Sequence, residues 1–304
     1  MERDQAHPVQ TEPSPPDPLP PDPMHAARLQ SIRSAYAQRI LALAGLAPGV
    51  GLGSEIAAAF ASIPREDFVC PPPWKTITPG THIPATSGDP AILYQDVLVP
   101  LGAAHGLNNG QPSLHALCLN ALAPQKGECA VHVGAGTGYY TAILAMLVGS
   151  SGHVDAYEIE PELARRAAAL LAGFPQVAVH SRSGAEAPLP ACDLLYVNAA
   201  AVEPLALWLD ALRPHGRLLF PLEPDNQDGK MLLVTRNPDG SWPARFLCGV
   251  QFVACAGAQN AQAARALSDA LWKRSGSQVR HLHRNNQPDD SCWCAGRDWW
   301  LSMR

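Results

Sequence analysis

Apolar and polar residues follow a repeating pattern from Glu128 to about residue 222. Short apolar runs, each the length of a β-strand, alternate with longer segments whose apolar residues recur at helical spacing. Strands and helices in alternation are typical of a parallel sheet that is covered by helices on both faces. The expected strands read CAVHVG, HVDAYE, VAVHS, DLLYVN and RLLFPL, and the expected helices cover residues 139–147, 161–172 and 204–212.

The pattern changes after the fifth of these strands. KMLLVTRN and ARFLCGVQFVAC have the composition of strands, and the turn-like PDGSWP joins them. Because a short connection of this kind joins antiparallel neighbours, we expect an antiparallel edge to the sheet. Together the seven strands predict an α/β fold with a Rossmann-like sheet.

The part of the chain that precedes the sheet is expected to be helical at both ends and irregular between them. Apolar residues have helical spacing over 24–46 and 55–62, and Pro112 is a favourable first residue for a helix that ends near Leu122. Residues 64–111 contain many prolines and glycines and show no sustained period. Long irregular segments of compact proteins usually have a functional role.

Composition divides the chain into four expected parts. Residues 1–23 are rich in Pro and Asp and poor in apolar residues, so we expect a disordered arm. Residues 24–122 are expected to form an N-terminal helical cap with a lid segment, and residues 123–258 a cofactor-binding domain. Residues 259–304 are expected to form a C-terminal extension that is helical over 259–273 and rich in aromatic residues.

Charge and composition exclude several classes of function. The net charge is −5 and the pI is near 6.1, so the basic surface of a nucleic-acid binder is missing. No apolar run approaches the roughly 18 residues that a membrane-spanning helix needs, and the chain does not begin like a secretory signal. The eight cysteines lie largely in apolar segments, as reduced cysteines do. We therefore expect a cytoplasmic protein without a nucleic-acid or membrane partner.

The most specific motif is VHVGAGTGYYTAILA, in which Gly134, Gly136 and Gly138 lie between an expected strand and an expected helix. A dinucleotide-binding loop would have its last glycine where Tyr139 stands, so this spacing disfavours a pyrophosphate ligand. A tight glycine turn lets an adenosine and an amino-acid chain lie against bare backbone. Glu158 ends the next expected strand, where a carboxylate can accept hydrogen bonds from two ribose hydroxyls. The alternatives are an ordinary strand-to-helix turn and a solvated surface acid.

Several further segments, in order and spacing, carry a family resemblance. They read IPREDFV, VGAGTGYYTAILA, EIEPELA, LLYVNAAA, LRPHGRLLFPL and MLLVTRNPDG. In these segments the chain resembles the protein-L-isoaspartate O-methyltransferases, a branch of the class I methyltransferases, over roughly residues 55–258. The resemblance implies a seven-stranded methyltransferase fold that binds S-adenosyl-L-methionine (SAM) in the first strand–helix crevice. It also implies that Gly134, Gly136, Gly138 and Glu158 contact this cofactor.

Two motifs that the resemblance implies are altered in this chain. The family's Thr-Ile-Ser-Gln-Pro motif has its serine at the isoaspartyl acceptor, but residues 108–112 read Asn-Asn-Gly-Gln-Pro, with Gly110 in place of the serine. The family's Gly-Asp-Gly motif has its aspartate near the adenine, but residues 182–184 read Arg-Ser-Gly. Because Gly and Ser do not replace a hydroxyl and a carboxylate chemically, we expect the cofactor crevice to be kept and the acceptor chemistry to differ. Gln111 and Ser183 are expected as cofactor contacts.

Other polar and aromatic residues have both a functional and a structural interpretation. Tyr139 and Tyr140 present a ring face to the sulfonium of the cofactor, or they pack a helix on the sheet. Asn198 lies at the carboxyl end of the fourth expected strand, where it holds a ligand or caps the next helix. His105 and His115 flank the NNGQP segment, and either is a candidate general base. We predict Asn198, Tyr140 and His105 as the catalytic residues.

The remaining candidates are weaker. Ser113 either compensates for the serine that Gly110 replaces or faces the first turn of its helix. Four residues of the irregular segment either form a lid or a wall of the acceptor site, or they form a hydrophobic strap that covers the core. They are Trp74, Tyr94, Gln95 and Asp96. Since the CxC and HxH spacings lack the usual gap of a zinc site, no metal is expected at Cys292, Cys294, His281 and His283. The residues expected to dock the tail onto the body or onto a partner chain are Trp293, Trp299 and Trp300.

These observations predict an enzyme that uses SAM to methylate a small molecule or a modified peptide rather than isoaspartyl proteins. Two alternatives stay open. In the first, SAM is itself the substrate of an intramolecular cyclisation that releases methylthioadenosine, as in azetidine-2-carboxylate synthases of similar fold. In the second, the protein binds SAM without catalysis, as a partner subunit. A homodimer is compatible with either chemistry.

Overall fold

The computed structural model describes residues 23–47, 49, 51–81, 84–102, 106–224, 227–284 and 287–304. The expected disordered arm lies outside the described residues except for Pro23, which begins the first helix. His105, one of the three predicted catalytic residues, also lies outside them.

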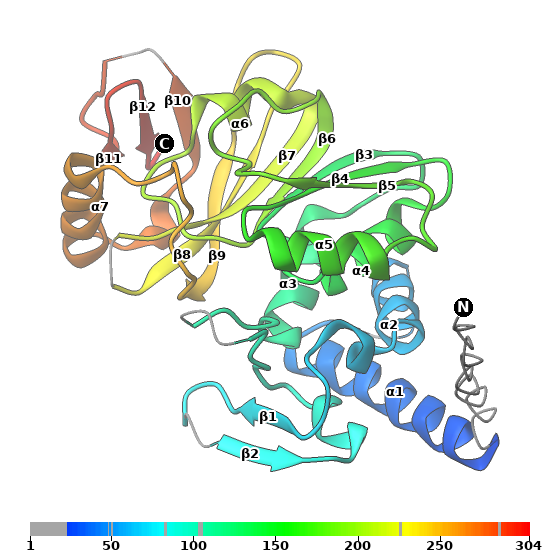
Figure 1. The fold of residues 1–304 in the computed structure, drawn as a ribbon. Helices are drawn as coiled ribbons and strands as arrows, with labels where there is room; N and C mark the ends of the chain where they lie inside the picture. The colour runs from blue at the N-terminus through cyan, green and yellow to red at the C-terminus, as the bar shows by residue number, and fades with distance from the viewer. Residues whose placement is uncertain are drawn as a thin grey trace, which may run out of the picture.

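The described chain is organised around a seven-stranded sheet with the strand order β5-β4-β3-β6-β7-β8-β9 (Figure 1). The first five strands are parallel, and β8 and β9 continue the sheet in antiparallel pairs, which confirms the α/β Rossmann-like prediction and its antiparallel edge. The strands are β3 (Cys129–Val133), β4 (His153–Glu158), β5 (Val177–Ser181), β6 (Cys192–Val197), β7 (Leu212–Leu222), β8 (Gly229–Thr235) and β9 (Ala244–Val250).

The two faces of the sheet pack into two different cores. In β6, Leu194 and Tyr196 belong to one core, whereas Leu195 and Val197 belong to the other. Successive side chains of a strand point to opposite faces, so a run of apolar residues without alternation shows that both faces are covered. The helices that connect the strands are α4 (Tyr139–Val148), α5 (Pro161–Leu170) and α6 (Ala206–Ala211).

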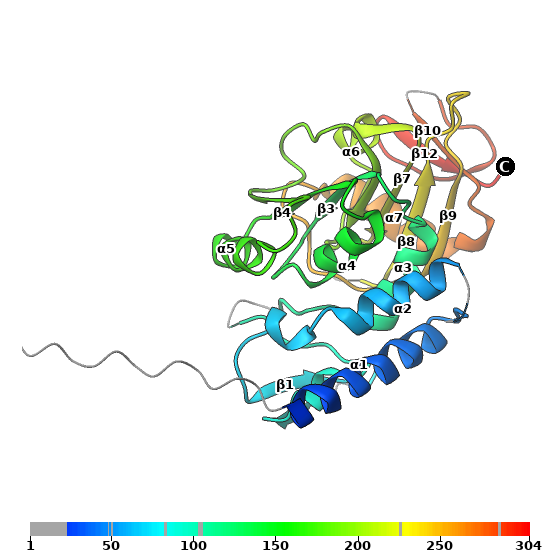
Figure 2. The ribbon, with the colours of Figure 1, turned by 90° about the vertical axis from the view of Figure 1, so that its right-hand side faces the viewer.

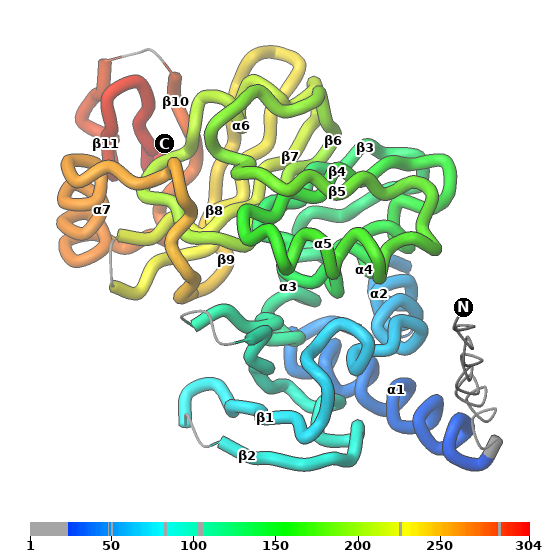
Figure 3. Tube along the Cα trace, in the orientation of Figure 1, coloured from blue at the N-terminus to red at the C-terminus, as the bar shows by residue number. Residues whose placement is uncertain are grey.

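The N-terminal elements form a layer against one face of the sheet (Figure 2 and the blue and cyan segments of Figure 3). Helix α2 contacts α4, and α1 contacts α3, so this layer packs on the helices that surround the glycine turn. Its elements are α1 (Pro23–Leu43), α2 (Leu52–Ser62), η1 (Arg65–Phe68), β1 (Trp74–Ile77), β2 (Pro84–Ser87), η2 (Pro90–Leu93) and α3 (Pro112–Leu122).

A fully buried arginine holds the irregular segment of this layer in place. The Arg65 guanidinium donates hydrogen bonds to four backbone carbonyls, and it has no carboxylate within salt-bridge distance among the described residues. The four acceptors are the carbonyl oxygens of Leu93, Gln95, Val97 and Gly110. One side chain therefore satisfies the backbone of a segment that has no regular hydrogen-bonding pattern of its own.

The C-terminal part contains the expected helix and a small sheet that the sequence did not predict. Helix α7 is present, but the aromatic tail folds into a three-stranded antiparallel sheet in the order β10-β12-β11. Each strand has four residues, too few for a period of two to stand out from the sequence. The elements are α7 (Ala261–Lys273), η3 (Gly276–Gln278), β10 (His281–Arg284), β11 (Cys292–Ala295) and β12 (Trp299–Ser302).

Tryptophans anchor this small sheet to the body of the protein. The Trp293 ring packs edge to face on Phe246 of β9, with 5.2 Å between the ring centroids. The indole N–H of Trp299 donates to a carboxylate oxygen of Glu203. Trp293 and Trp299 therefore attach the tail to the rest of the same chain, which is one of the two arrangements expected from the sequence. None of the described helices is long and apolar enough to cross a membrane.

Candidate active site

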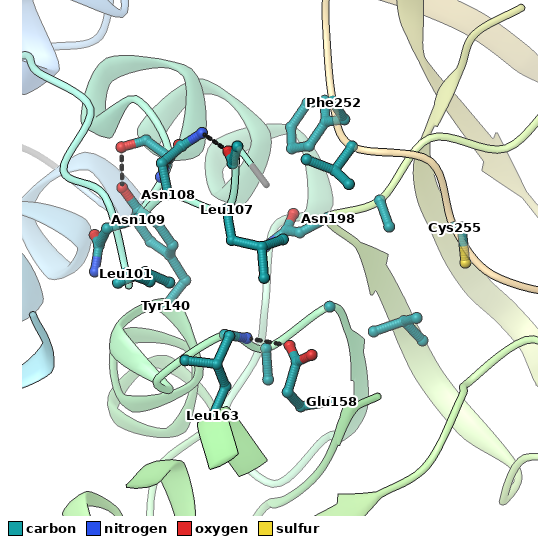
Figure 4. A pocket seen from close by; sticks show the side chains of 18 of the residues that line it. Leu101, Leu107, Asn108, Asn109, Tyr140, Glu158, Leu163, Asn198, Phe252 and Cys255 are labelled. Carbon is teal, nitrogen blue, oxygen red and sulfur yellow. Dashed lines mark hydrogen bonds between the residues drawn. The ribbon is translucent and has the colours of Figure 1, made fainter. Parts of the chain in front are cut away.

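A cavity of about 810 Å³ lies at the carboxyl ends of β3, β4 and β6. From β3 the chain proceeds to β4 and β5 on one side, and it then crosses to β6 and β7 on the other. Open parallel sheets bind their ligands at such a point, because the two directions of winding leave a crevice there. Figure 4 shows Glu158 below Asn198, with Leu107, Asn109 and Tyr140 on one side and Phe252 and Cys255 on the other.

The glycine turn leaves bare backbone at the floor of this cavity. Gly134 follows β3 with a φ of +76°, which glycine adopts without strain. A Cβ at this position would lie 3.1 Å from the backbone oxygen of Asn198, so a side chain would also crowd the end of the neighbouring strand β6. The turn therefore allows close approach of a ligand, as its sequence predicts.

Glu158 is held in one orientation at the end of β4. Its two carboxylate oxygens accept hydrogen bonds from the backbone N–H groups of Gly136, at 2.7 Å, and Glu160, at 2.9 Å. Burial raises the pKa of this carboxyl, whereas the backbone N–H groups act in the opposite direction. A carboxylate fixed in this way at the cavity wall, next to an open glycine turn, fits the ribose and the amino-acid chain of SAM.

Asn198 belongs to a buried hydrogen-bonded array that includes a residue which sequence reasoning missed. Its side-chain N–H donates to Nε2 of His132, at 2.7 Å, and His132 Nδ1 bonds to the Thr141 hydroxyl at 2.8 Å. Complete burial lowers the pKa of His132 to about 3, so this imidazole is neutral. The Asn198 Oδ1 atom has no hydrogen-bond partner among the described residues, although it is buried at the edge of the cavity. The available signal was a histidine inside the otherwise apolar strand CAVHV.

Tyr139 and Tyr140 both line the cavity and both pack in the core. Tyr139 makes edge-to-face contacts with Phe60 and Phe68 of the N-terminal layer. Tyr140 stacks on His115 with ring centroids 3.5 Å apart and an angle of 13° between the planes. The packing interpretation therefore holds for both residues, and contact of either ring with a sulfonium stays a prediction.

His115 occupies the space beside Gly110, the position at which the resemblance implies a serine. Gly110 has a φ of +66°, and a Cβ built there would lie 2.2 Å from His115 Nε2. The imidazole cannot easily move aside, because its Nδ1 is 2.6 Å from the Tyr196 hydroxyl and its face is covered by Tyr140. The structure thus provides no room for a serine side chain at residue 110.

The other polar residues near this segment bond mainly to one another. The Gln111 amide donates to Asp96 and to Ser113, and the Ser113 hydroxyl also donates to Asp96. Ser113 does not line the cavity, so it does not replace the missing hydroxyl there. Ser183 lines the cavity, but its hydroxyl donates to the Ala256 carbonyl and accepts from the Ala185 N–H. Cofactor contacts of Gln111 and Ser183 stay predictions.

Two of the four residues expected to form a lid or a strap, Trp74 and Tyr94, are buried. Tyr94 is buried and its hydroxyl bonds to Glu66 and Arg33, while the Trp74 indole N–H donates to the Cys70 carbonyl. None of the residues expected in a lid, which are Trp74, Tyr94, Gln95 and Asp96, lines the cavity. In the tail, His283 stacks on Trp300 and bonds to the Ser302 hydroxyl. The part of the chain that the structure describes contains no cluster of three or more potential metal ligands.

A smaller cavity of about 250 Å³ adjoins the first and shares Phe252 with it. Its wall includes Glu223, which directly follows β7 and is only 5% exposed. The carboxylate accepts the Phe252 backbone N–H. Burial raises the pKa of the Glu223 carboxyl to about 7. Sequence reasoning did not single out this residue.

Comparisons with known proteins find one family over most of the chain. The model of a family described as protein-L-isoaspartate (D-aspartate) O-methyltransferase matches residues 46–260. A protein-L-isoaspartate O-methyltransferase of Gloeobacter violaceus is 31% identical over 204 residues, which cover 63% of this chain and 88% of the relative. One from Ignicoccus hospitalis is 30% identical over 212 residues, which cover 68% of this chain and 92% of the relative. Helix α1 and residues 261–304 lie outside the family match.

Solved structures support the same fold. A structure named as a protein-L-isoaspartate O-methyltransferase superposes with a TM-score of 0.59 at 22% identity, covering 81% of this chain and 68% of its own. One of a Plasmodium falciparum protein named in the same way, in complex with S-adenosyl-L-homocysteine, gives a TM-score of 0.56 at 18% identity. That match covers 74% of this chain and 98% of the other.

Proposed function

Because the chain belongs to the protein-L-isoaspartate O-methyltransferase family and is a SAM-dependent methyltransferase, we propose that its acceptor is a small molecule or a modified peptide rather than an isoaspartyl protein. The family relationship supports the cofactor and the type of reaction. The choice of acceptor rests on the part of the cavity in which this chain departs from the family pattern.

The cofactor half of the cavity fits SAM. The open backbone at Gly134 and Gly136 and the fixed carboxylate of Glu158 would hold its amino-acid chain and its ribose. When bound, SAM supplies an electrophilic methyl group on a sulfonium. The protein's own contribution is to orient this group toward the acceptor half of the cavity and to exclude water from it.

The observation that carries the proposal is the contact between Gly110 and His115. A side chain at residue 110 would meet the imidazole at 2.2 Å, and this imidazole is held by Tyr140 and Tyr196. Whatever acceptor binds here therefore meets an imidazole and bare backbone where the family resemblance implies a serine hydroxyl. A site that replaces one hydrogen-bonding group by another of different shape and chemistry selects a different substrate.

The competing acceptor is the one named for the relatives, the isoaspartyl carboxylate. The two alternatives that the sequence left open, cyclisation of SAM and binding without catalysis, are not favoured, since the relatives are named as methyltransferases. The proposal therefore has to be tested against isoaspartyl methylation in the first place.

The test is methyl transfer from isotopically labelled SAM to an isoaspartyl peptide, to small molecules and to modified peptides, with mass spectrometry of all adenosine products. We expect S-adenosylhomocysteine to form with an acceptor other than the isoaspartyl peptide. Methylation of the isoaspartyl peptide at a rate comparable to that of a family member assayed alongside would overturn the proposal. Methylthioadenosine formed without any acceptor, above the spontaneous rate, would restore the cyclase alternative.

A further inference from the structure

The second cavity, of about 250 Å³, continues the crevice of the first from β6 toward β7. Asn198 follows β6 and lines the first cavity, whereas Ala200, two residues further on, lines the second. Glu223 follows β7, the next strand of the sheet, and its backbone N–H donates to the Ala201 carbonyl at 2.9 Å. The two cavities therefore lie side by side at the carboxyl ends of parallel strands, where sheets of this type bind their ligands.

The two cavities share part of one wall. Gln251, Phe252 and Ala254, which follow β9, line both of them. The Phe252 ring also approaches His115, with 6.5 Å between the ring centroids, so this wall belongs to the acceptor half of the first cavity rather than to the glycine turn. A molecule whose reacting group enters beside Phe252 is therefore close enough to extend a short side group into the second cavity.

The Glu223 carboxylate in the second cavity has few partners. Of the described residues that line this cavity, Glu223 is the only one with a titratable side chain, and it is 5% exposed. Its two oxygens share one donor, the Phe252 backbone N–H, at distances of 3.0 and 3.3 Å. It forms no ion pair with a Lys, Arg or His among the described residues. Since an ionised carboxylate has about four lone-pair sites, Glu223 has room for further donors.

The surroundings of Glu223 make its ionised form unfavourable in the absence of a ligand. Burial raises the pKa of the carboxyl to about 7, the Phe252 N–H acts in the opposite direction, and the charge of Asp228 raises the pKa further. A glutamine would accept the same N–H without a buried charge. A carboxylate that lacks a counter-charge at the wall of a ligand cavity is typical of a binding site.

The rest of the wall suits an organic cation better than a metal ion or an anion. The Gln259 side-chain N–H donates to the carbonyls of Ala200 and Cys255, and its amide oxygen has no hydrogen-bond partner among the described residues. Phe252 adds an aromatic ring, which attracts cations. A single carboxylate is a poor metal site, and the described residues contain no cluster of three or more potential metal ligands. An anion would be repelled by Glu223.

From this geometry we propose that the second cavity binds an ammonium group of the methyl acceptor, with the Glu223 carboxylate as its counter-ion and the Gln259 amide oxygen as a further hydrogen-bond acceptor. The inference rests on the proposed function, because it assigns the ammonium group to the acceptor. It narrows the acceptor to small molecules or modified peptides that carry a positively charged amine apart from the group that is methylated. Glu223 then determines specificity and takes no part in the transfer of the methyl group.

The first test observes binding directly and needs no acceptor. The Phe252 N–H donates to the carboxylate, and the chain has six phenylalanines, so ¹⁵N-phenylalanine labelling gives few NMR signals. The Phe252 signal is assigned by its loss in Phe252→Leu. With S-adenosylhomocysteine bound, we expect n-butylammonium to shift this signal saturably, whereas 1-butanol, butyrate and potassium chloride should not.

The matched variants show whether the carboxylate holds the ammonium group. Glu223→Gln should raise the Kd of n-butylammonium by about tenfold or more, the size of a hydrogen bond to a charged group. The exposed Glu162→Gln serves as the control and should leave this Kd unchanged. The inference is wrong if n-butylammonium does not shift the Phe252 signal, if 1-butanol shifts it equally, or if Glu223→Gln binds as tightly as the wild type.

A pH series separates binding by the carboxylate from an indirect effect of the substitution. Only the ionised carboxylate pairs with an ammonium group, and the pKa of Glu223 is about 7. The Kd of n-butylammonium in the wild type should therefore be about tenfold lower at pH 8 than at pH 6. Glu223→Gln should show no such change. A Kd that is independent of pH in the wild type would overturn the inference.

The second test compares acceptors that differ only in an ammonium group. Tyramine is paired with 4-ethylphenol, and capped Ser-Lys is paired with capped Ser-norleucine. Formation of S-adenosylhomocysteine from SAM is measured for each compound. In a pair that reacts, we expect kcat/KM to be about tenfold or more higher for the member with the ammonium group, mainly through KM, and Glu223→Gln should abolish this preference. Equal kcat/KM values within a reacting pair would count against the inference.

The outcomes separate this inference from the proposed function. If n-butylammonium does not bind at Glu223, the inference is wrong, whereas the assay with the isoaspartyl peptide still decides the proposed function. If n-butylammonium binds but the isoaspartyl peptide is methylated at the rate of a family member, the proposed function is wrong and the second cavity remains an ammonium site. If neither pair of acceptors reacts, the shift of the Phe252 signal decides the inference.

Discussion

At the scale of single residues, the contact between Gly110 and His115 can be tested by adding the side chain that the family resemblance implies. Gly110→Ser combines an unfavourable backbone conformation with a clash against Nε2. We expect it to lower the free energy of unfolding by about 2 to 4 kcal/mol, from strain at positive φ and overpacking together. Thermal or urea unfolding measures this loss.

The matched control for this substitution is Gly240→Ser. Gly240 has a φ of +83° but no atom within 4 Å of the added Cβ, so it reports the backbone strain alone. Equal losses of stability in the two variants would mean that the space beside His115 is open after all.

Glu158 gives a second prediction at this scale. Its carboxylate is fixed by two backbone N–H groups and faces the cavity, so it can bind ribose hydroxyls without reorganising. Glu158→Ala should weaken binding of S-adenosylhomocysteine by about 1 to 3 kcal/mol through lost charged hydrogen bonds. Calorimetry measures the change, with Glu162→Ala on the exposed face of α5 as the control. Unaltered affinity in Glu158→Ala would remove this residue from the cofactor site.

Glu223 predicts a pH dependence of stability. The pKa of Glu223 is about 7 in the folded protein, against an ordinary value of 4.5. As the pH rises, the Glu223 carboxyl therefore loses its proton in the unfolded state before it does so in the folded state. The stability contributed by protonated Glu223 is present below pH 4.5 and is lost as the pH rises to about 7. Glu223→Gln, which keeps an acceptor for the Phe252 N–H, should be more stable than the wild type at pH 8 by about 1 to 3 kcal/mol.

The difference between Glu223→Gln and the wild type should shrink toward pH 5. Urea unfolding at several pH values measures it, and Asp269→Asn, at an exposed site on α7, should show no such trend. A constant difference between Glu223→Gln and the wild type from pH 5 to pH 8 would contradict the raised pKa.

At the scale of elements, Arg65 is the residue on which the irregular segment between η2 and α3 depends. Arg65→Met keeps much of the buried volume but leaves four carbonyl groups without their donor. Since each buried carbonyl without a partner costs about 1 to 3 kcal/mol, we expect residues 93–102 to open locally. Hydrogen exchange of peptides from this range should become faster by tenfold or more. Arg165→Met, at an exposed ion pair, is the control, and a uniform increase over the whole chain would contradict local opening.

Several regular elements could be predicted from the sequence, because the spacing of their apolar residues and the residues at their ends indicate the same element. Helix α3 begins and ends at the predicted residues Pro112 and Leu122, and β4 and β5 coincide with HVDAYE and VAVHS. The strands of the tail could not be predicted, since four-residue strands have too little pattern and their partners are distant in the sequence.

The sequence singled out most residues that line the expected cofactor half of the cavity and fewer of those that line the rest. Gly134 and Glu158 act through local geometry, at strand ends that the pattern of the chain already marks. The roles of His132 and His115 depend on contacts with Asn198 and Tyr196, which lie 66 and 81 residues further along the chain. A single sequence contains no signal for such pairs. What it did contain was the unusual polarity of both histidines within apolar segments.

At the scale of the whole molecule, the tail sheet is part of the fold and not an appendage. Trp293 is only 2% exposed and packs on β9, the edge strand of the main sheet. Trp293→Ala should destabilise the protein by about 3 to 5 kcal/mol, as truncation of a buried tryptophan does. Trp272→Ala is the matched control, because that ring on α7 is 90% exposed and its loss should stay within about 0.5 kcal/mol. Similar melting temperatures for the two variants would show that the tail contributes little to stability.

The contacts that hold residues 65–115 in place have a consequence for biosynthesis. Residues 65–115 leave the ribosome before the residues that support them. His115 bonds to Tyr196, and the Phe68 carbonyl accepts from the Thr137 hydroxyl, so both partners are synthesised later. Domains commonly fold from the N-terminus as they are made, but this segment has to wait for β6. During that interval its apolar residues are exposed on the nascent chain. We therefore expect the yield of soluble protein to depend on translation speed and on chaperones more strongly than it would if residues 65–115 followed the sheet in the sequence.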